Sequence, residues 1–187
     1  MRRFPYLLLP AVFFLITAAW AGDLDLTQRF LLLATTKTST MQKELDQASA
    51  AGYRVIGSSP TSGSEMVVIM EKLAKPPDNY QYHLLATSRT STMQKEISEQ
   101  AEKGFRLLPK TIIAKQQMFG GQEIVLLMEK PPGKEQLYKY LLLATSRTST
   151  MQKEMAQAVD EGFEVVGMVS RGEHVVILEK PAGAVGL

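Results

Sequence analysis

One segment of this chain occurs three times with almost no change. It reads ATSRTSTMQKE from Ala86 to Glu96 and again, letter for letter, from Ala144 to Glu154. A third copy, ATTKTSTMQKE, runs from Ala34 to Glu44. An apolar run precedes every copy, and a glycine-aromatic pair and a second apolar run ending in Glu-Lys follow it. Such self-similarity is typical of tandem repeats, in which small units pack on their neighbours.

Each repeat carries the local signals of strand, helix, strand and strand. The apolar runs are short, rich in Leu, Val, Ile and aromatic residues, and bounded by turn formers, which favours strands. Gln42 follows Ser39 by three residues, which predicts a capping box with Ser39 as the helix N-cap, and Ser91 and Ser149 repeat this pattern. A glycine then stands where a left-handed residue would end each helix, at Gly52, Gly104 and Gly162.

We therefore predict an α+β fold of three tandem βαββ repeats packed together, each a three-stranded, mostly antiparallel sheet with one helix on a face. The third strand should lie between the other two, because the helical crossover makes the first two strands parallel. The closing strands are apolar on both faces, so a neighbouring repeat or another chain should cover the face away from the helix. The predicted divisions are a signal peptide at 1–21, repeats at 22–72, 80–130 and 137–180, and a tail at 181–187.

The N-terminus has the composition of a secretory signal. Arg2 and Arg3 precede an apolar run from Phe4 to Ala18, and Ala19-Trp20-Ala21 places small residues where a signal peptidase reads them. We expect cleavage after Ala21 and export to the bacterial periplasm or the medium, with an uncleaved membrane anchor as the alternative. After cleavage, we expect no membrane span.

Charge and cysteine content narrow the function classes. The chain has 21 basic and 19 acidic side chains, and two of the basic ones lie in the predicted signal, so the mature chain is formally neutral. Neutrality argues against a general nucleic-acid binder. The absence of cysteine excludes disulfides, thiol catalysis and thiolate metal sites.

The second half of each repeat resembles a known family. "GFEVVG", followed by "HVVILEK" from His174 to Lys180, is similar to very small bacterial domains of unknown function. In these domains a helix ends in Gly-aromatic-Glu-Leu-Val and a closing strand resembles Ile-Leu-Lys-Arg. The likeness is clearest at 162–166, is weaker at 104–108, and leaves out the Thr-Ser-Thr-Met-Gln-Lys-Glu segment. It implies a βαββ fold and no particular activity.

Residues that could carry chemistry are sparse. His83 and His174 occupy non-equivalent places in their repeats, so we predict neither a metal site nor another cofactor. The repeated segment has many hydroxyls but no histidine that could act as their base. We therefore predict no catalytic residues and a non-enzymatic protein, with an enzyme of unrecognised type as an alternative.

The repeated segment itself admits two interpretations. It is either the contact between repeats, which we favour, or a site for a small anion such as phosphate, sulfate or a carboxylate. The second interpretation follows from helix N-terminal amides, hydroxyls and a cation standing together. The residues of that site would be Lys37, Thr38, Ser39, Thr40, Arg89, Thr90, Ser91, Thr92, Arg147, Thr148, Ser149 and Thr150.

Repeat 2 has a longer connection between its last two strands. Residues 110–122 include four large apolar side chains: Ile112, Ile113, Met118 and Phe119. An insertion this apolar seldom lies free in water. It either extends two strands that pack on a neighbouring repeat, which we favour, or it docks a protein partner or a second copy. The sequence thus predicts an exported structural or interaction module whose ligand it does not name.

Overall fold

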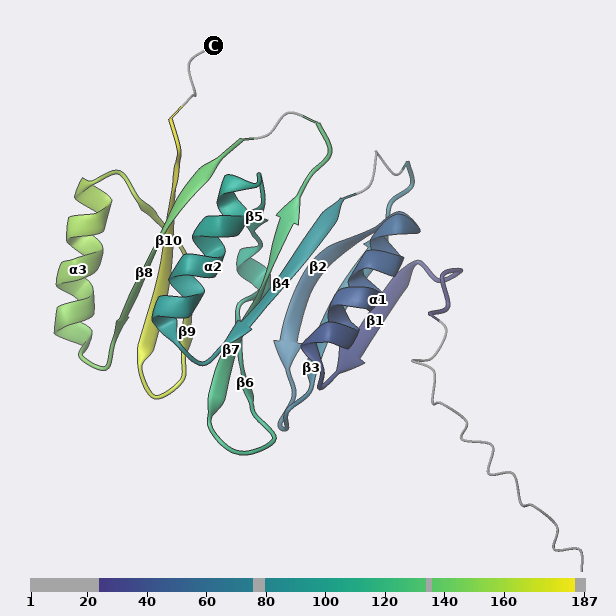
Figure 1. Ribbon diagram of the computed structural model, residues 1–187, viewed down its shortest axis with the longest axis horizontal. Coiled ribbons are helices and arrows are strands. Elements are labelled where there is room, and N and C mark those ends of the chain that lie inside the picture. The colour runs from purple at the N-terminus through teal and green to yellow at the C-terminus, as the bar shows by residue number, and fades with distance from the viewer. Residues whose placement is uncertain (1–23, 76–79, 134–135, 184–187) are drawn as a thin grey trace, which may run out of the picture.

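The computed structural model describes residues 24–75, 80–133 and 136–183. These residues form an α+β fold with three α-helices and three antiparallel sheets arranged in a row (Figure 1). We refer to residues 24–72 as unit 1, 80–130 as unit 2 and 137–181 as unit 3. The predicted signal peptide at 1–21 lies outside the described residues.

The elements follow the predicted order in each unit. Unit 1 comprises β1 (Phe30–Thr35), α1 (Thr38–Ala50), β2 (Tyr53–Pro60) and β3 (Met66–Lys72). Unit 2 comprises β4 (Gln81–Thr87), α2 (Thr90–Glu102), β5 (Arg106–Leu107), the 3-10 helix η1 (Pro109–Thr111), β6 (Ile113–Gln116) and β7 (Gln122–Lys130). Unit 3 comprises β8 (Tyr138–Thr145), α3 (Thr148–Asp160), β9 (Glu164–Ser170) and β10 (His174–Pro181).

The closing strand lies in the middle of every sheet, as predicted. The strand orders are β1-β3-β2, β4-β7-β5 and β8-β10-β9, and all pairs are antiparallel. The expectation of three strands is wrong for unit 2, in which β6 also pairs with β7. Pro109 follows β5 closely and has no N–H for the ladder, so the chain makes a 3-10 turn before it rejoins the sheet as β6.

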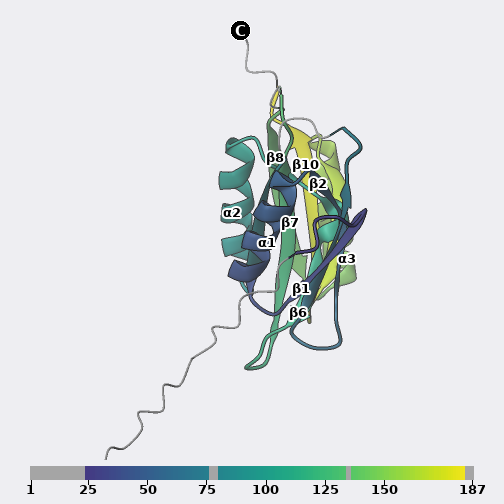
Figure 2. The same cartoon turned by 90° about the vertical axis from the view of Figure 1, so that its right-hand side faces the viewer.

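Each helix covers one face of its own sheet, and the next unit approaches from the same side. α1 contacts β4 as well as β1 and β2, and α2 contacts β8 as well as β4 and β5. Figure 2 looks along the row from the unit 1 end and shows these layers behind one another. Units 2 and 3 thereby bury the sheet face that turns away from their own helix, as the two-sided apolar strands predict.

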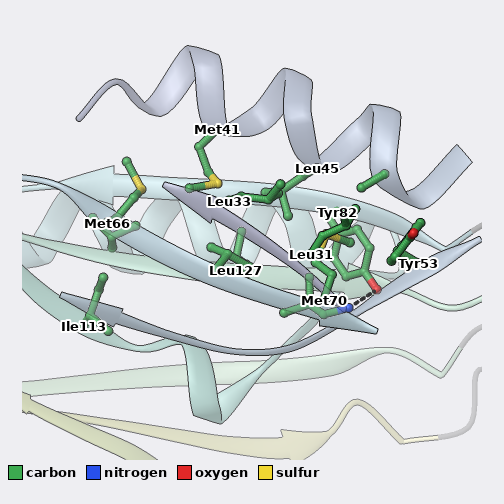
Figure 3. Close-up of a cluster of buried hydrophobic side chains, with 14 residues drawn as sticks. Leu31, Leu33, Met41, Leu45, Tyr53, Met66, Met70, Tyr82, Ile113 and Leu127 are labelled. Carbon is green, nitrogen blue, oxygen red and sulfur yellow. Dashed lines mark hydrogen bonds between the residues drawn. The ribbon is translucent and has the colours of Figure 1, made fainter. Parts of the chain in front are cut away.

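The cores cross the boundaries between units. One cluster joins Leu31, Leu33, Met41 and further residues of unit 1 to Tyr82 and Leu127 of unit 2 (Figure 3). A second cluster joins Met93, Ile97 and their neighbours in unit 2 to unit 3 residues that include Tyr140, Val175 and Ile177. Because units this small bury little apolar surface alone, these shared cores stabilise the whole row.

The helices begin one residue before the predicted serines, so the capping-box prediction is wrong. The N-caps are Lys37, Arg89 and Arg147, and none makes a side-chain capping bond. A threonine hydroxyl two residues earlier accepts the N-cap N–H instead, as in Thr35 Oγ1 to Lys37 N at 3.2 Å. This local turn orients the chain so that the serine lies within the first helical turn, and its hydroxyl does not cap the helix.

The helix ends are as predicted. Gly52, Gly104 and Gly162 have φ of 87°, 88° and 88°, and each follows the last helical turn. The N–H of Phe163 bonds the carbonyl of Ala158 at 3.0 Å, which closes the helix with the backbone pattern typical of a left-handed glycine.

Valine at position 162 tests this assignment. We expect Gly162→Val to lower the free energy of unfolding by about 1–2 kcal/mol, because a side chain at positive φ is strained even though open space surrounds the site. Gly63→Val is the control, since a Cβ at Gly63 would meet only the Thr61 hydroxyl, at 4.0 Å, and Gly63 is not at positive φ. Denaturant melts of both variants make the comparison, and equal midpoints would contradict the helix stop.

Candidate functional site

The glutamine of the repeated segment reaches out of its own unit. Gln42 Nε2 donates to the Tyr82 carbonyl at 2.9 Å, and Gln42 Oε1 accepts the N–H of Leu84 at 2.9 Å. Both partners are backbone groups of β4, an edge strand of the unit 2 sheet. The glutamine amide therefore takes the place that a neighbouring strand would occupy and fixes the register between α1 and β4.

The second copy of the segment does the same. Gln94 Nε2 donates to the Tyr140 carbonyl at 3.0 Å, and Gln94 Oε1 accepts the N–H of Leu142 at 2.7 Å. Gln152, in the third copy, is exposed and makes no such bond among the described residues. The difference follows position in the row, because the described chain has no unit beyond α3.

We refer to the contact between consecutive units as a joint. The second part of each joint is a polar cluster in which a buried tyrosine and a buried glutamate meet a part-exposed arginine. Glu129 of β7 accepts Arg54 Nη2 of β2 at 2.8 Å and the hydroxyl of Tyr82 at 2.9 Å. That hydroxyl accepts the N–H of Val55 at 3.1 Å, the bond dashed in Figure 3. No buried side-chain nitrogen or oxygen of the described residues lacks a hydrogen-bond partner, which is the condition for burying a carboxylate without a large cost.

The joint between units 2 and 3 has the same cluster. Arg106 Nε donates to Glu179 at 3.1 Å, and the Tyr140 hydroxyl donates to Glu179 at 2.9 Å. The Tyr140 hydroxyl also accepts the N–H of Leu107 at 2.9 Å. The Arg106 guanidinium lies over the ring of Tyr138, 4.3 Å from its centroid. The Arg106 guanidinium is therefore held by the Glu179 carboxylate and by the ring of Tyr138.

Burial changes the acidity of the two joint tyrosines. Desolvation raises the pKa of Tyr82 and of Tyr140 far above the ordinary value, and the carboxylates of Glu129 and Glu179 raise it further. A folded-state pKa above the unfolded one stabilises the protein below the unfolded pKa, and this stabilisation is lost as pH rises. The joints should therefore weaken in alkali.

Alkaline denaturation tests this. Between pH 10 and 11, we expect each buried tyrosine to remove about 1 kcal/mol of stability, because only the unfolded chain releases the phenolic proton there. In Tyr82→Phe the fall of unfolding free energy across this range should be smaller by that amount. Tyr80→Phe is the control, because the half-buried Tyr80 ring lies over the Arg54 guanidinium, at 4.6 Å, and this substitution keeps the ring while removing the hydroxyl. Equal falls in all three chains would show that Tyr82 is not held protonated.

A buried cation forms the third part of each joint. Lys115 Nζ donates to the Thr36 carbonyl at 3.4 Å and pairs with Glu123 at 2.8 Å. In the next joint Arg171, from the turn between β9 and β10, donates to Thr90 Oγ1 at 2.9 Å. The turn that opens the repeated segment is thus held by the hairpin of the following unit in both joints.

The residues predicted for an anion site lie together at the start of each helix. The side chains of Lys37, Arg89 and Arg147 are exposed, and so are the serines that follow them. In the second copy the Thr90 hydroxyl is already occupied, because it bonds Arg171 and Glu173. An open depression of about 490 Å³ lies on α3 beside Ser149 and Thr150. The anion site remains a hypothesis.

The long connection of unit 2 divides into two parts. Ile113 packs in the core shared with unit 1, and Ile112 packs in the core shared with unit 3. Met118 and Phe119, at the tip, are exposed. The base of the insertion therefore packs against both neighbours, whereas the tip contacts no core.

Other chemistry is sparse in the described parts of the chain. They contain no group of three or more metal-ligating side chains. His83 is half-buried beside the ring of Phe105, and burial lowers its pKa. A groove of about 410 Å³ runs between the two joints, and its charged lining is Arg54, Arg106, Glu129 and Glu179, which already pair with one another. None of the described helices has the length and apolarity to cross a membrane.

Sequence reasoning missed the joints for an identifiable reason. It assigned the glutamine to helix capping, and it had no cue that Arg54 pairs with Glu129. The signal was nonetheless present, because units 1 and 2 have arginine after the glycine-aromatic pair and units 2 and 3 have tyrosine at the start of the sheet. Comparison of the chain with family models, curated proteins and solved structures finds no match. The resemblance to small bacterial domains therefore stays an expectation.

Proposed function

We propose that this chain is an exported, non-enzymatic structural or interaction module built from three tandem βαββ repeats. The observation that carries the proposal is the use of Gln42 and Gln94, in the near-invariant segment, to bond the next unit. A segment kept almost unchanged in order to join units needs no ligand to explain it. In this proposal, other molecules bind to the outer surface of the three packed units.

A thermal-shift series tests this against the anion-binding alternative. We expect the wild-type melting temperature to be the same in phosphate as in chloride at equal ionic strength. Arg89→Ala with Arg147→Ala should change stability by less than about 1 kcal/mol in either salt, because both arginines are exposed. A phosphate-dependent rise that this double variant abolishes would replace the proposal with an anion-binding function, since a ligand stabilises the state that binds it.

Export has a separate test. The motivating observation is the pair Arg2-Arg3, the apolar run and the A-x-A site. Intact-mass measurement of the protein recovered from the periplasm or medium should give a chain that begins at Gly22. A full-length mass in the membrane fraction would show that the leader is an anchor.

A further inference from the structure

We infer that a second copy of this chain docks on the first, head to tail, with unit 1 of one copy seated on unit 3 of the next as unit 2 is seated on unit 1 within the chain. The inference rests on the proposed function and names the partner of the module. It follows from the two ends of the row, which are the two halves of a joint.

The outer face of unit 1 is the first half. Leu32 is 69% exposed, Phe30 47% and Ile69 38%. The residues at the same places in unit 2 include Tyr82 at 4% and Leu127 at 1%, because unit 1 covers them. Unit 1 thus presents to solvent a sheet face that the following units bury.

The outer face of unit 3 is the second half. Val159 on α3 is 53% exposed and Val165 on β9 is 46% exposed. At the same places in unit 2, Ala101 is 1% and Leu107 is 2% exposed, because unit 3 covers them. Each exposed face therefore has, inside the same chain, an example of the surface that buries it.

The unit 3 end of the row also carries the glutamine that joins units elsewhere in the chain. Gln152 is the third copy of Gln42 and Gln94, and it is exposed. The positions that correspond to its missing partners are the Phe30 carbonyl and the Leu32 N–H. The Arg29 carbonyl accepts the N–H of Lys72, so by the alternation of an antiparallel ladder the Phe30 and Leu32 backbone groups point to the open edge of β1.

The charges at the ends differ from those inside the row. Phe30 stands where the other units have tyrosine, and Glu164 stands where units 1 and 2 have arginine. Glu71, the counterpart of Glu129, is already paired with Arg29 at 2.8 Å. Docking would bring Glu164 of one copy close to the Arg29–Glu71 ion pair of the next copy. The contact between copies keeps the apolar faces and the glutamine but lacks the tyrosine–glutamate–arginine cluster, so it is weaker than a joint and reversible.

The contact is heterologous, since the two surfaces that meet are different. Copies joined in this way form a closed ring or an open series that lengthens with concentration, and not an isologous dimer. Copies that instead docked through the exposed tip at Met118 and Phe119 would not need the outer faces of units 1 and 3. Variants at the tip and at the outer faces therefore distinguish the two modes of association.

Sedimentation measures the association and maps it. For the wild-type chain, we expect the weight-average mass to rise above the monomer between roughly 10 µM and 1 mM, the range of a weak contact. Leu32→Lys should abolish this rise. Phe119→Lys is the matched control, because it charges an apolar side chain that is fully exposed and away from both ends. A wild-type chain that stays monomeric throughout, or association lost in Phe119→Lys and kept in Leu32→Lys, overturns the inference.

A gain-of-affinity variant tests the geometry. Arg29→Gln, Phe30→Tyr and Glu164→Arg together give the ends the residues found in the joint between units 1 and 2. The triple variant should associate at least about tenfold more tightly than the wild type, because it restores the missing cluster. Unchanged or weaker association would show that the ends do not meet as a joint.

Cysteine pairs test the polarity, since the chain has no cysteine of its own. Leu32→Cys and Gln152→Cys, mixed and oxidised, should form disulfide-linked pairs that contain one copy of each. Predominant Leu32→Cys homodimers would overturn the head-to-tail arrangement. The proposed function is judged separately, by the phosphate and chloride melts, which are run at concentrations where the chain is monomeric.

Discussion

Replacing Arg106 with methionine is expected to lower the free energy of unfolding by on the order of 2 kcal/mol, because it removes the half-exposed cation that pairs with a buried glutamate. The Glu179 carboxylate is 8% exposed and would keep only the Tyr140 hydroxyl as a donor. The size of the effect comes from leaving that charge buried without its cation. Urea denaturation measures it.

Position 164 supplies the matched control for this prediction. Glu164 follows the glycine-aromatic pair of unit 3 as Arg106 follows that of unit 2, and both side chains are exposed, but only Arg106 of the two pairs with a buried carboxylate. Glu164→Met should therefore change stability by less than about 0.5 kcal/mol. A second variant, Arg106→Met with Glu179→Gln, should recover part of the loss, because it removes the buried charge. If Arg106→Met and Glu164→Met cost equally little, the arginine behaves as a surface ion-pair partner and the joint model fails.

Chain topology could be predicted because its signals are local. Gly52, Gly104 and Gly162 marked the helix ends, and the order of apolar runs fixed which strand lies in the middle of each sheet. The helix N-caps were predicted two residues late, at Ser39 and its equivalents instead of Lys37 and its equivalents. The Thr35 hydroxyl and its equivalents accept the N–H of the residue two positions on, and this turn competes with capping by the serine hydroxyl. The two alternatives differ only in which hydroxyl accepts a backbone N–H at the helix start.

The joints could not be predicted because their partners are distant along the chain. Arg54 and Glu129 lie 75 positions apart, and no local rule pairs them. Gln42 also bonds Asp46 within its own helix at 2.8 Å, and this local use concealed its partners on β4. The division of the unit 2 insertion was also hidden, because Ile113 and Phe119 are equally apolar in sequence and only the fold buries one and exposes the other.

The repeated glutamine is the residue through which the near-invariant segment joins the units. Gln94→Ala is expected to lower the free energy of unfolding by roughly 2 kcal/mol, because it leaves the Tyr140 carbonyl and the Leu142 N–H without a protein partner in a half-buried joint. Gln42→Ala should have a similar effect through β4. Alanine keeps the helix intact, since its helix propensity is at least that of glutamine.

Gln152 makes the comparison internal to one protein. It lies at the same place in the repeated segment as Gln42 and Gln94, but no unit follows it within the described chain. It also has Ala156 four residues on, where the other two glutamines have an intrahelical partner, Asp46 or Ser98. The measurement is the free energy of unfolding of the three single alanine variants, taken at a concentration where the chain is monomeric. The account predicts a loss of roughly 2 kcal/mol for positions 42 and 94 and less than about 0.5 kcal/mol for position 152. Equal changes at all three positions would contradict it, because they would assign the glutamine to its own helix.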